Sequence, residues 1–430
     1  KEQVFVDITG RNDWSSSMVY TNGSGNNSYF YPSVSTSWLI NETFQLPSWV
    51  SLAKTRLSWA QVGNDTDPYF INKGYSLGTI ELSGGSYAYT NNKSTTFVNP
   101  GIKPERKNSF EAGIDFRVLN NRAGVDFTLY DEKINHQIGT IPVSTESGYG
   151  SMASNIGSLT NKGVELSVRV VPVKTKSFEW ESTFNYWHNK TMVSNLNKEV
   201  GEYKVLGGDI AYGNFRIGSV AYENGEYGVL MSDSNPLKWN NTSDSKDPRN
   251  GKKILTWVDT RRGAYYTRSY KPERVGKIQP DFEGSWNNDF KYKNFSLSVL
   301  VDARFGGTIA SYSNRYGTAY GYLETSLKGR DPEHGGISWA SNYSDIKGQQ
   351  FIDGVIPDGV FKDGQKVTAP NGTSVNVGGL TYQEAFDKGY VEPTHASYFT
   401  YRTNDWGNGV VNDNWVSEVK YIALRNVTVS

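Results

Sequence analysis

The sequence predicts an all-β protein, part of a large antiparallel transmembrane β-barrel with long extracellular loops. Three observations predict this fold. Apolar and polar side chains alternate over short segments, long and short connections alternate along the chain, and aromatic residues make up 14% of a chain that is only 37% hydrophobic. Outer-membrane barrels combine strands that have a lipid side and a wet side with short turns at one end and long loops at the other.

The clearest element is a hairpin over Ser109–Lys133. Its apolar residues recur at every second position from Phe110 to Val118, stop at Asn120-Asn121 and then resume. A period of two is typical of a β-strand, and an Asn pair tolerates the positive φ of a tight turn. One hairpin alone fits both a half-buried soluble sheet and a lipid-facing barrel wall, so the connections must decide.

The same alternation predicts further strands along the chain. In chain order they are Val4–Thr9, Val34–Ile40, about Ser48–Gln61, Val164–Val171, Phe178–Trp187, Phe282–Phe290, Phe295–Phe305 and Tyr421–Val429. The connections between successive strands are alternately long and short, and all the long ones fall at one end. Because loops beyond about 15 residues are uncommon in compact soluble domains, we expect a membrane barrel, with further short strands inside the two longest loops.

Composition excludes several classes of protein. Lys and Arg number 44 and Asp and Glu number 44, so nothing indicates a nucleic-acid partner. The sequence has no run of about 18 apolar residues that would predict a transmembrane helix. It has no cysteine, which excludes disulfides, thiolate catalysis and cysteine-zinc sites.

The sequence predicts neither an enzyme nor a cofactor. No GxSxG, P-loop or HExxH motif is present, and the histidines are scattered: His136, His188, His334 and His395. Asn64–Asp67 and Asp353–Asp363 contain oxygen ligands, but neither has EF-hand spacing. We interpret them as solvated turn acids and expect no metal site, with a loop calcium as the alternative.

Eight charged residues fall on the polar side of the predicted strands: Glu111, Asp115, Arg117, Asp126, Glu165, Arg169, Asp302 and Arg304. In a barrel they would face the lumen. We expect them to form ion pairs along the wall and to hold a plug, with ligand contact as the alternative. Their mixed sign argues against a single-sign ion filter.

The two longest loops carry aromatic residues among Asn, Asp, Gly and Ser. The substrate- or lid-contacting candidates are Trp239, Trp257, Tyr265, Tyr266, Tyr316, Tyr320, Trp339, Trp406 and Trp415. Exposed rings can stack on a sugar, and Tyr and Trp also anchor peptides and protein partners. The third interpretation is that these rings pack the loops on themselves.

Six stretches of the chain resemble the SusC/RagA class of TonB-dependent outer-membrane transporters. They are Val6–Glu42, Lys54–Asp65, Ile102–Lys133, Asn155–Val168, Val275–Val299 and Lys420–Ser430. Each match is loose alone, but the six occur in family order. The resemblance implies a barrel of about 22 strands, plugged by an N-terminal domain and preceded by a TonB box.

The resemblance also implies how the protein is organised and what it does. We expect residues 1–430 to be a partial barrel domain, with the N-terminal plug and the final barrel strands absent. The expected partners are a SusD-like surface lipoprotein, the TonB-ExbB-ExbD machinery, outer-membrane lipid and, through pairing of complexes, a second transporter–lipoprotein pair.

The expected function is active import of oligomers across the outer membrane, with oligosaccharides as the first substrate class and oligopeptides as the second. Two other functions stay open at this point: a passive porin or structural barrel, and a secreted β-rich glycan-binding module. An extracellular β-propeller enzyme would need a four-strand repeat, and the sequence has none.

Overall fold

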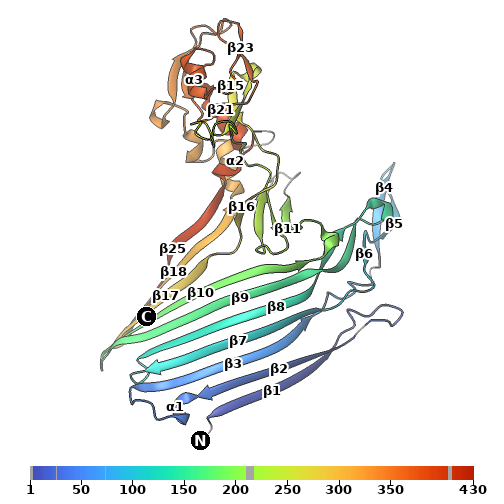
Figure 1. Cartoon of the computed structure of the whole chain (residues 1–430), viewed down its shortest axis with the longest axis vertical. Coiled ribbons are helices and arrows are strands. Elements are labelled where there is room, and N and C mark those ends of the chain that lie inside the picture. The colour runs from blue at the N-terminus through green and yellow to red at the C-terminus, as the bar shows by residue number, and fades with distance from the viewer. Residues whose placement is uncertain (1–2, 26, 73, 210–216, 405–408) are drawn as a thin grey trace.

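The computed structural model describes residues 3–25, 27–72, 74–209, 217–404 and 409–430. Within them, one large antiparallel sheet runs in chain order and carries loop regions at one end (Figure 1). Its consecutive strands are β1 (Val4–Trp14), β2 (Ser28–Leu39), β3 (Val50–Asn64), β7 (Glu105–Val118), β8 (Ala123–Pro142), β9 (Ser151–Lys174), β10 (Phe178–Leu196), β17 (Phe282–Tyr292), β18 (Phe295–Ala310) and β25 (Val416–Val429).

Each predicted strand overlaps one of these strands, so the prediction of an all-β fold is confirmed. The predicted hairpin is β7 and β8, which pair directly. Its turn has the expected positive φ, with values of 55° at Leu119, 56° at Asn120 and 63° at Asn121.

Two boundary predictions are wrong. Ile40 begins the short helix α1 (Ile40–Thr43) instead of ending a strand. The long connection expected before Val164 is mostly strand, because β8 extends to Pro142 and β9 begins at Ser151. The extra length carries Ser, Thr, Asn and Gly on both sides, so its side chains show no apolar–polar alternation.

The strand register gives the sheet one apolar face and one polar face. Ile114 lies opposite Phe127 and Thr55, whereas Asp115 lies opposite Asp126. Side chains of directly opposite residues project from the same face. The apolar face stays uncovered: Ile114 is 49% exposed. Other exposed apolar side chains on this face are Val4, Val6, Ile8, Leu57, Trp59, Phe110, Val125, Leu129, Phe184, Trp286, Leu297, Ile422 and Leu424.

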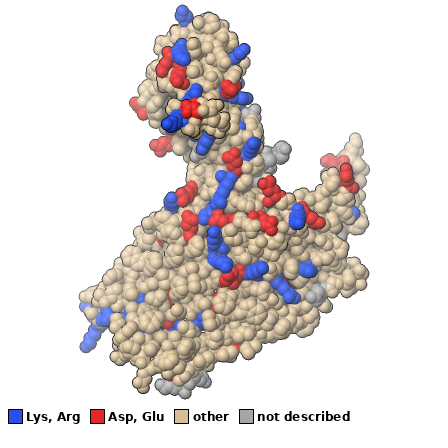
Figure 2. Space-filling model, in the orientation of Figure 1, with Lys and Arg blue, Asp and Glu red and all other residues tan. Residues whose placement is uncertain are grey.

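The apolar face ends at a belt of charges near the loops. Asp131 on β8 lies opposite Lys162 on β9, which lies opposite Lys190 on β10, and the Lys162 Nζ is 2.7 Å from Asp131 Oδ2. Trp59 and Phe110 pair beside them. Figure 2 shows a broad surface of the sheet with few charges, bordered on the loop side by Lys, Arg, Asp and Glu. Aromatic girdles flank the hydrocarbon in outer-membrane barrels, so this belt marks the membrane boundary.

Smaller elements decorate the connections of the first half. They are the hairpin β4 (Tyr75–Leu82) and β5 (Ser86–Lys93), the short strand β6 (Thr96–Val98), which pairs in parallel with β9, and the 3-10 turn η1 (Thr145–Ser147). No helix in the described part of the chain is long and apolar enough to cross a membrane.

The described parts of 197–281 and 311–415 lie above the sheet, and we call them the loop body (Figure 1). Its strands are β11 (Lys204–Asp209), β12 (Ile217–Ala221), β13 (Val229–Ser232), β14 (Ile254–Val258), β15 (Gly263–Tyr266), β16 (Glu273–Lys277), β19 (Ile337–Ala340), β20 (Gln350–Val355), β21 (Val360–Phe361), β22 (Lys366–Thr368), β23 (Ser374–Asn376) and β24 (Thr394–His395). Its helices are α2 (Tyr312–Ala319), α3 (Tyr382–Asp387) and α4 (Ala396–Asn404), with 3-10 turns η2 (Lys198–Val200), η3 (Asp259–Arg261), η4 (Glu324–Leu327), η5 (Pro332–His334) and η6 (Asn412–Asn414). The prediction of short strands inside the two longest loops is therefore confirmed.

The two loops are joined by a shared core. β14 from the first loop pairs in parallel with β21 from the second. Around them pack Leu255, Trp257, Phe361 and Tyr382, all of which are buried. The Tyr382 hydroxyl donates a hydrogen bond to Glu392 O at 2.7 Å. This core joins the described parts of the two loops into one packed unit.

Trp415 fixes the loop body to the top of the sheet. Its side chain is fully buried and its Nε1 donates to Val411 O at 2.8 Å. The Arg315 guanidinium lies 5.1 Å from the ring centroid and its Nε donates to Asn404 O at 2.9 Å. Trp415 immediately precedes β25, so this contact links the end of the second loop to the strand that follows.

We predict that Ile114→Arg blocks assembly of the sheet in the membrane. A charge on the lipid face near the midplane costs about 2–4 kcal/mol. The measurement is the fraction of full-length protein in the outer membrane with heat-modifiable mobility. Glu111→Arg, on the polar face of the same strand, is the matched control and should assemble normally. Equal behaviour of the two variants would contradict the assigned faces.

We predict that Trp415→Ala loosens the loop body, because removing a buried Trp side chain costs about 3–5 kcal/mol. Limited proteolysis of the full-length protein in membranes should then cleave within 311–415 at protease concentrations that leave the wild type intact. Tyr320→Ala is the control, since that ring is 51% exposed. If Trp415→Ala resists protease as the wild type does, the anchoring role of Trp415 is wrong.

Candidate functional site

The eight predicted wall charges share one face of the sheet. Asp126 lies opposite Ser167 on β9. Glu165 and Arg169 lie two residues before and after Ser167, so their side chains project from the same face. Across β10 and β17 the register continues from Ser167 to Asp302 through Asn185 and Ser285. The structure therefore brings together side chains from β7, β8, β9 and β18 as one polar wall.

Most of these charges are paired within the wall. The Arg56 guanidinium donates to both Asp126 oxygens at 3.1 and 2.8 Å. Arg117 makes the same two-point contact with Asp115 at 3.1 and 3.0 Å. Bidentate contacts fix the planar guanidinium and orient the carboxylate.

The later strands continue the pattern. Arg169 donates to both oxygens of Glu181, at 2.7 and 2.5 Å. Asp302 accepts from Arg425 Nε at 2.8 Å, and Arg304 lies 3.5 Å from Glu283. In these pairs, opposite charges along the wall compensate each other locally.

Two acids of the wall differ from the rest. Glu111 accepts a long hydrogen bond from Ser109 Oγ, at 3.5 Å, and Glu165 forms no ion pair with any described residue. Glu111 lines a hollow of about 250 Å³ in the wall, together with Asp7, Arg56 and Thr128. This hollow offers hydroxyl, carboxylate and guanidinium groups to a polar ligand.

Sequence reasoning missed the partners of the wall charges. Arg56, Glu181, Glu283 and Arg425 all lie on the same face as the charges they meet. The alternation of Phe178–Trp187 places Glu181 on the polar side, so that signal was available in the sequence. The pairings themselves depend on register between strands.

Three of the aromatic candidates lie in the interior. Trp257 is 4% exposed and its Nε1 donates to Asp259 Oδ1 at 2.7 Å. Tyr265 is 9% exposed and lies under the Arg402 guanidinium, while Trp415 is fully buried. For these three, the structure places the rings where they pack the loops on themselves, so they present no surface to substrate or lid.

The other described candidates are partly accessible. Tyr316 and Tyr320 stack with centroids 6.3 Å apart. Trp239 lies 5.4 Å from the Arg249 guanidinium, and the ring of Tyr266 contacts Phe399 edge-on. Trp406 lies outside the described residues.

Trp339 lines a hollow of the loop body that measures about 730 Å³. Asn342, Ser344 and Asn371 supply amide and hydroxyl groups around it. Glu392 lies at its inner side, buried, and accepts from the Ser341 hydroxyl at 2.8 Å. An aromatic ring beside amides and a carboxylate is a surface suited to a polyhydroxylated ligand.

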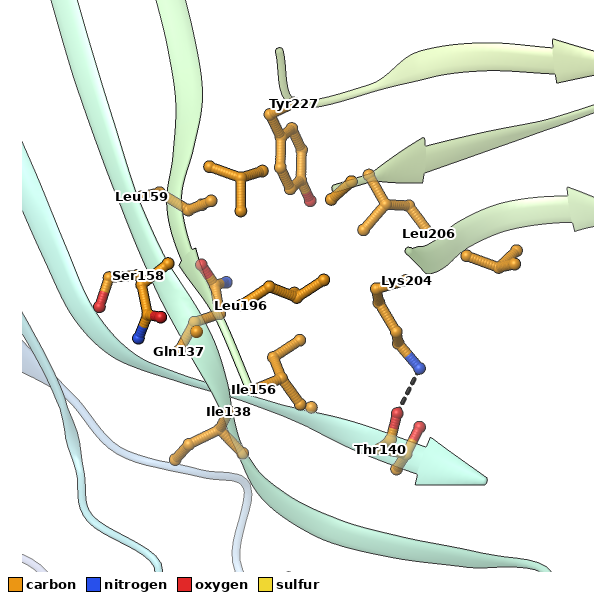
Figure 3. Close-up of a pocket in the computed structure, with 16 residues that line it drawn as sticks. Gln137, Ile138, Thr140, Ile156, Ser158, Leu159, Leu196, Lys204, Leu206 and Tyr227 are labelled. Atoms are coloured by element: carbon orange, nitrogen blue, oxygen red, sulfur yellow. Dashed lines mark hydrogen bonds between the residues drawn. The ribbon is translucent and has the colours of Figure 1, made fainter. Parts of the chain in front are cut away.

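A second cavity lies where the loop body meets the top of the sheet, and we call it the rim pocket (Figure 3). It measures about 320 Å³. The strands β8, β9, β10, β11 and β12 contribute its lining, with the segment that precedes β13. Its apolar lining residues are Ile138, Ile156, Leu159, Val193, Leu196, Val205, Leu206, Ala221 and Tyr227.

Two polar side chains of the rim pocket have unusual surroundings. Lys204 Nζ donates to Thr140 O across the cavity (Figure 3), and burial lowers the pKa of Lys204. The Gln137 Oε1 is buried without a hydrogen-bond partner. No sequence motif indicated this pocket, because it joins segments that are far apart in the chain.

The histidines are dispersed in the structure as well. His395 Nδ1 lies 3.0 Å from Asp353, and His334 Nδ1 lies 2.7 Å from Asp331, whose pKa is lowered by this hydrogen bond. Among the described residues, no three His, Asp or Glu side chains converge as metal ligands would. A loop calcium at Asn64–Asp67 or Asp353–Asp363 stays a hypothesis.

Comparison with known proteins gives several relatives. TonB-dependent receptor P3 of Formosa agariphila is 29% identical over 319 residues, which are 71% of this chain and 30% of that protein. TonB-dependent receptor SusC of Bacteroides thetaiotaomicron is 31% identical over 200 residues, which are 43% of this chain and 19% of that protein. The chain therefore spans a third or less of the curated relatives that it matches.

Solved structures share the fold. The RagAB peptide importer in its "closed-closed" state covers 100% of this chain at a TM-score of 0.61 and 15% sequence identity, and the match takes up 39% of that chain. Another RagAB structure, described as a peptide transporter, covers 74% of this chain at a TM-score of 0.55 and 17% identity, over 33% of that chain.

The family model described as "TonB dependent receptor-like, beta-barrel" matches residues 2–228, more than half of the chain. The matched region contains β1 to β10, the strands that carry most of the polar wall and the apolar face opposite it. With the face assignment and the relatives named SusC and TonB-dependent receptor, this match places the sheet in the bacterial outer membrane. The chain belongs to the TonB-dependent receptor-like β-barrel family, and it is similar to the SusC/RagA type.

Proposed function

We propose that this chain is the wall and loop region of an outer-membrane importer that takes up oligomeric nutrients with energy from TonB. The observation that carries the proposal is the separation of faces. The apolar side chains around Ile114 are uncovered, whereas the charges around Asp115 pair along the opposite face. Such a sheet needs hydrocarbon on one side and water on the other.

The proposed partners follow from the relatives. We infer that a SusD-like surface lipoprotein covers the loop side, and that TonB-ExbB-ExbD acts through an N-terminal plug domain. Two transporter–lipoprotein pairs would form a dimer. The order of the strands and the position of the loop body at one end of the sheet support a lid on that side.

Oligosaccharides are the cargo that we propose first. The support is the hollow beside Trp339, which Asn342 and Asn371 also line. The neutral pairing of the wall also suits uncharged cargo, because no uncompensated field of one sign would repel or trap it.

Oligopeptides are the second candidate. The rim pocket favours them, since its lining is apolar and a sugar would lose hydrogen bonds there. A similar solved structure, the RagAB importer, is described as a peptide importer. Because the relatives are named as receptors and the solved structures as transporters, they support a transport role over an enzymatic one.

Passive diffusion through a porin is the main rival. A growth experiment distinguishes passive diffusion from TonB-dependent import. The gene is deleted, the deletion strain is complemented with the full-length gene, and both strains are grown on defined oligosaccharides or oligopeptides as sole nutrient. Import should fail in a strain without TonB as it does in the deletion strain. Uptake that persists without TonB would establish a passive channel instead.

We predict that Trp339→Ala in the full-length protein weakens oligosaccharide binding about tenfold, because the variant loses the apolar ring surface that a sugar face would cover. Isothermal titration of the purified complex with the oligosaccharide that supports growth measures this change. Tyr87→Ala is the control: this ring is 64% exposed on β5 and does not line the hollow. If Trp339→Ala binds the oligosaccharide with unchanged affinity, the hollow is not the binding site.

A further inference from the structure

The rim pocket lies on the same side of the sheet as the polar wall. Leu159 lies two residues before Asn161 on β9, so their side chains project from the same face of the strand. Asn161 lies opposite Glu132 and Thr191. Leu159 itself lies opposite Ile134 and Val193 without a register shift in between. Cargo that passes along the wall therefore reaches the pocket without crossing the sheet.

The pocket interrupts an otherwise polar surface. Asn161 and Glu132 are hydrogen-bonded to each other just below it, whereas Val193, Leu196 and Ala221 above them form a buried apolar cluster with Leu206 and Tyr227 packed against it. A cavity of about 320 Å³ is at the small end of ligand pockets. It has room for one large side chain, not for a whole oligomer.

The lining selects the chemistry of the group that enters. A hydroxyl that is buried without a hydrogen-bond partner loses its hydration and gains nothing in return. A sugar ring would therefore be rejected by the Ile156, Leu159 and Leu206 side of the cavity. A branched aliphatic or aromatic side chain, by contrast, gains free energy with each CH₂ that it removes from water.

The ammonium group of Lys204 at the edge of the pocket favours an anionic group next to that side chain. Lys204 reaches across the pocket to Thr140 O, which uses one of the three N–H donors of its ammonium group. In the described part of the chain no carboxylate pairs with it. An ammonium in a half-buried position gains from an anion that completes its hydrogen bonds.

Gln137 also lines the pocket, but its Oε1 is enclosed by the protein and gives a ligand no accessible acceptor. The pocket thus offers an apolar cavity and a cation within one site.

We propose that the rim pocket binds the C-terminal residue of a peptide that ends in a large apolar amino acid. The side chain fills the cavity, and the terminal carboxylate pairs with Lys204. The inference rests on the proposed import function for its biological role, and it selects peptides as the cargo that this site recognises.

The test uses the purified full-length protein with its co-purifying partners and three probes. These are the tripeptide Ala-Ala-Leu, the same peptide amidated at its C-terminus, and Ala-Ala-Ser, each titrated by calorimetry. We expect Ala-Ala-Leu to bind, amidation to weaken it about tenfold, and replacement of leucine by serine to weaken it by a similar factor.

Variants separate the two halves of the site. Lys204→Gln should abolish the difference between acid and amide and keep the preference for leucine. Leu206→Asn should do the reverse. Lys271→Gln, at an exposed lysine away from the pocket, should bind as the wild type does. If Leu206→Asn fails to assemble, the Lys204→Gln comparison still decides.

Three results would overturn the proposal: equal binding of acid and amide by the wild type, an acid preference that survives Lys204→Gln, or no binding of any tripeptide at millimolar concentration. If these occur while the full-length gene still restores TonB-dependent growth on an oligosaccharide, only the pocket assignment is wrong. If the tripeptide binds as expected but no nutrient requires the gene, the site stands and the import function does not.

Discussion

Each strand of the large sheet must satisfy its backbone through its neighbours, and this constraint sets the structure on both sides of the sheet. The strands follow one another in chain order, so nearly every strand is paired along both edges by the segments before and after it. With the backbone satisfied, the side chains are free to differ between the faces. That is why Ile114 and Phe127 can meet hydrocarbon while Asp115 and Asp126, one residue away along each strand, face water.

The same constraint explains why the loops have a core of their own. Above the charged belt water contacts both faces of the sheet. Because no lipid covers apolar side chains there, the chain must bury them within the protein. The loops between β10 and β17 and between β18 and β25 do this together, through the parallel pair of β14 and β21 and the ring of Tyr382. Trp415 then ties the unit to the start of β25.

The proposed binding site lies where the polar face of the sheet changes its character. Along the wall, two-point contacts such as Arg169 with Glu181 leave little uncompensated charge. At the rim, the wall becomes apolar around Leu159, and the ammonium group of Lys204 lies beside the cavity with a backbone carbonyl as its partner. Under the function that we propose, a cargo with one apolar end and one anionic group would move along the wall and bind at the rim.

The sequence alone determined the strand order and the two faces of the sheet, because the apolar–polar period of two and the lengths of the connections are local properties of the chain. The hairpin within Ser109–Lys133 and its turn could be predicted for this reason. In the first part of β9, from Ser151, water contacts both faces and the apolar–polar alternation is absent. The sequence therefore did not predict this part of the strand. Only the tertiary structure decided that Trp415 is buried while Trp339 borders a hollow, and that Lys204 meets Thr140, 64 residues away in the chain. Loop composition records which rings are present, whereas their burial depends on which distant segment packs against them.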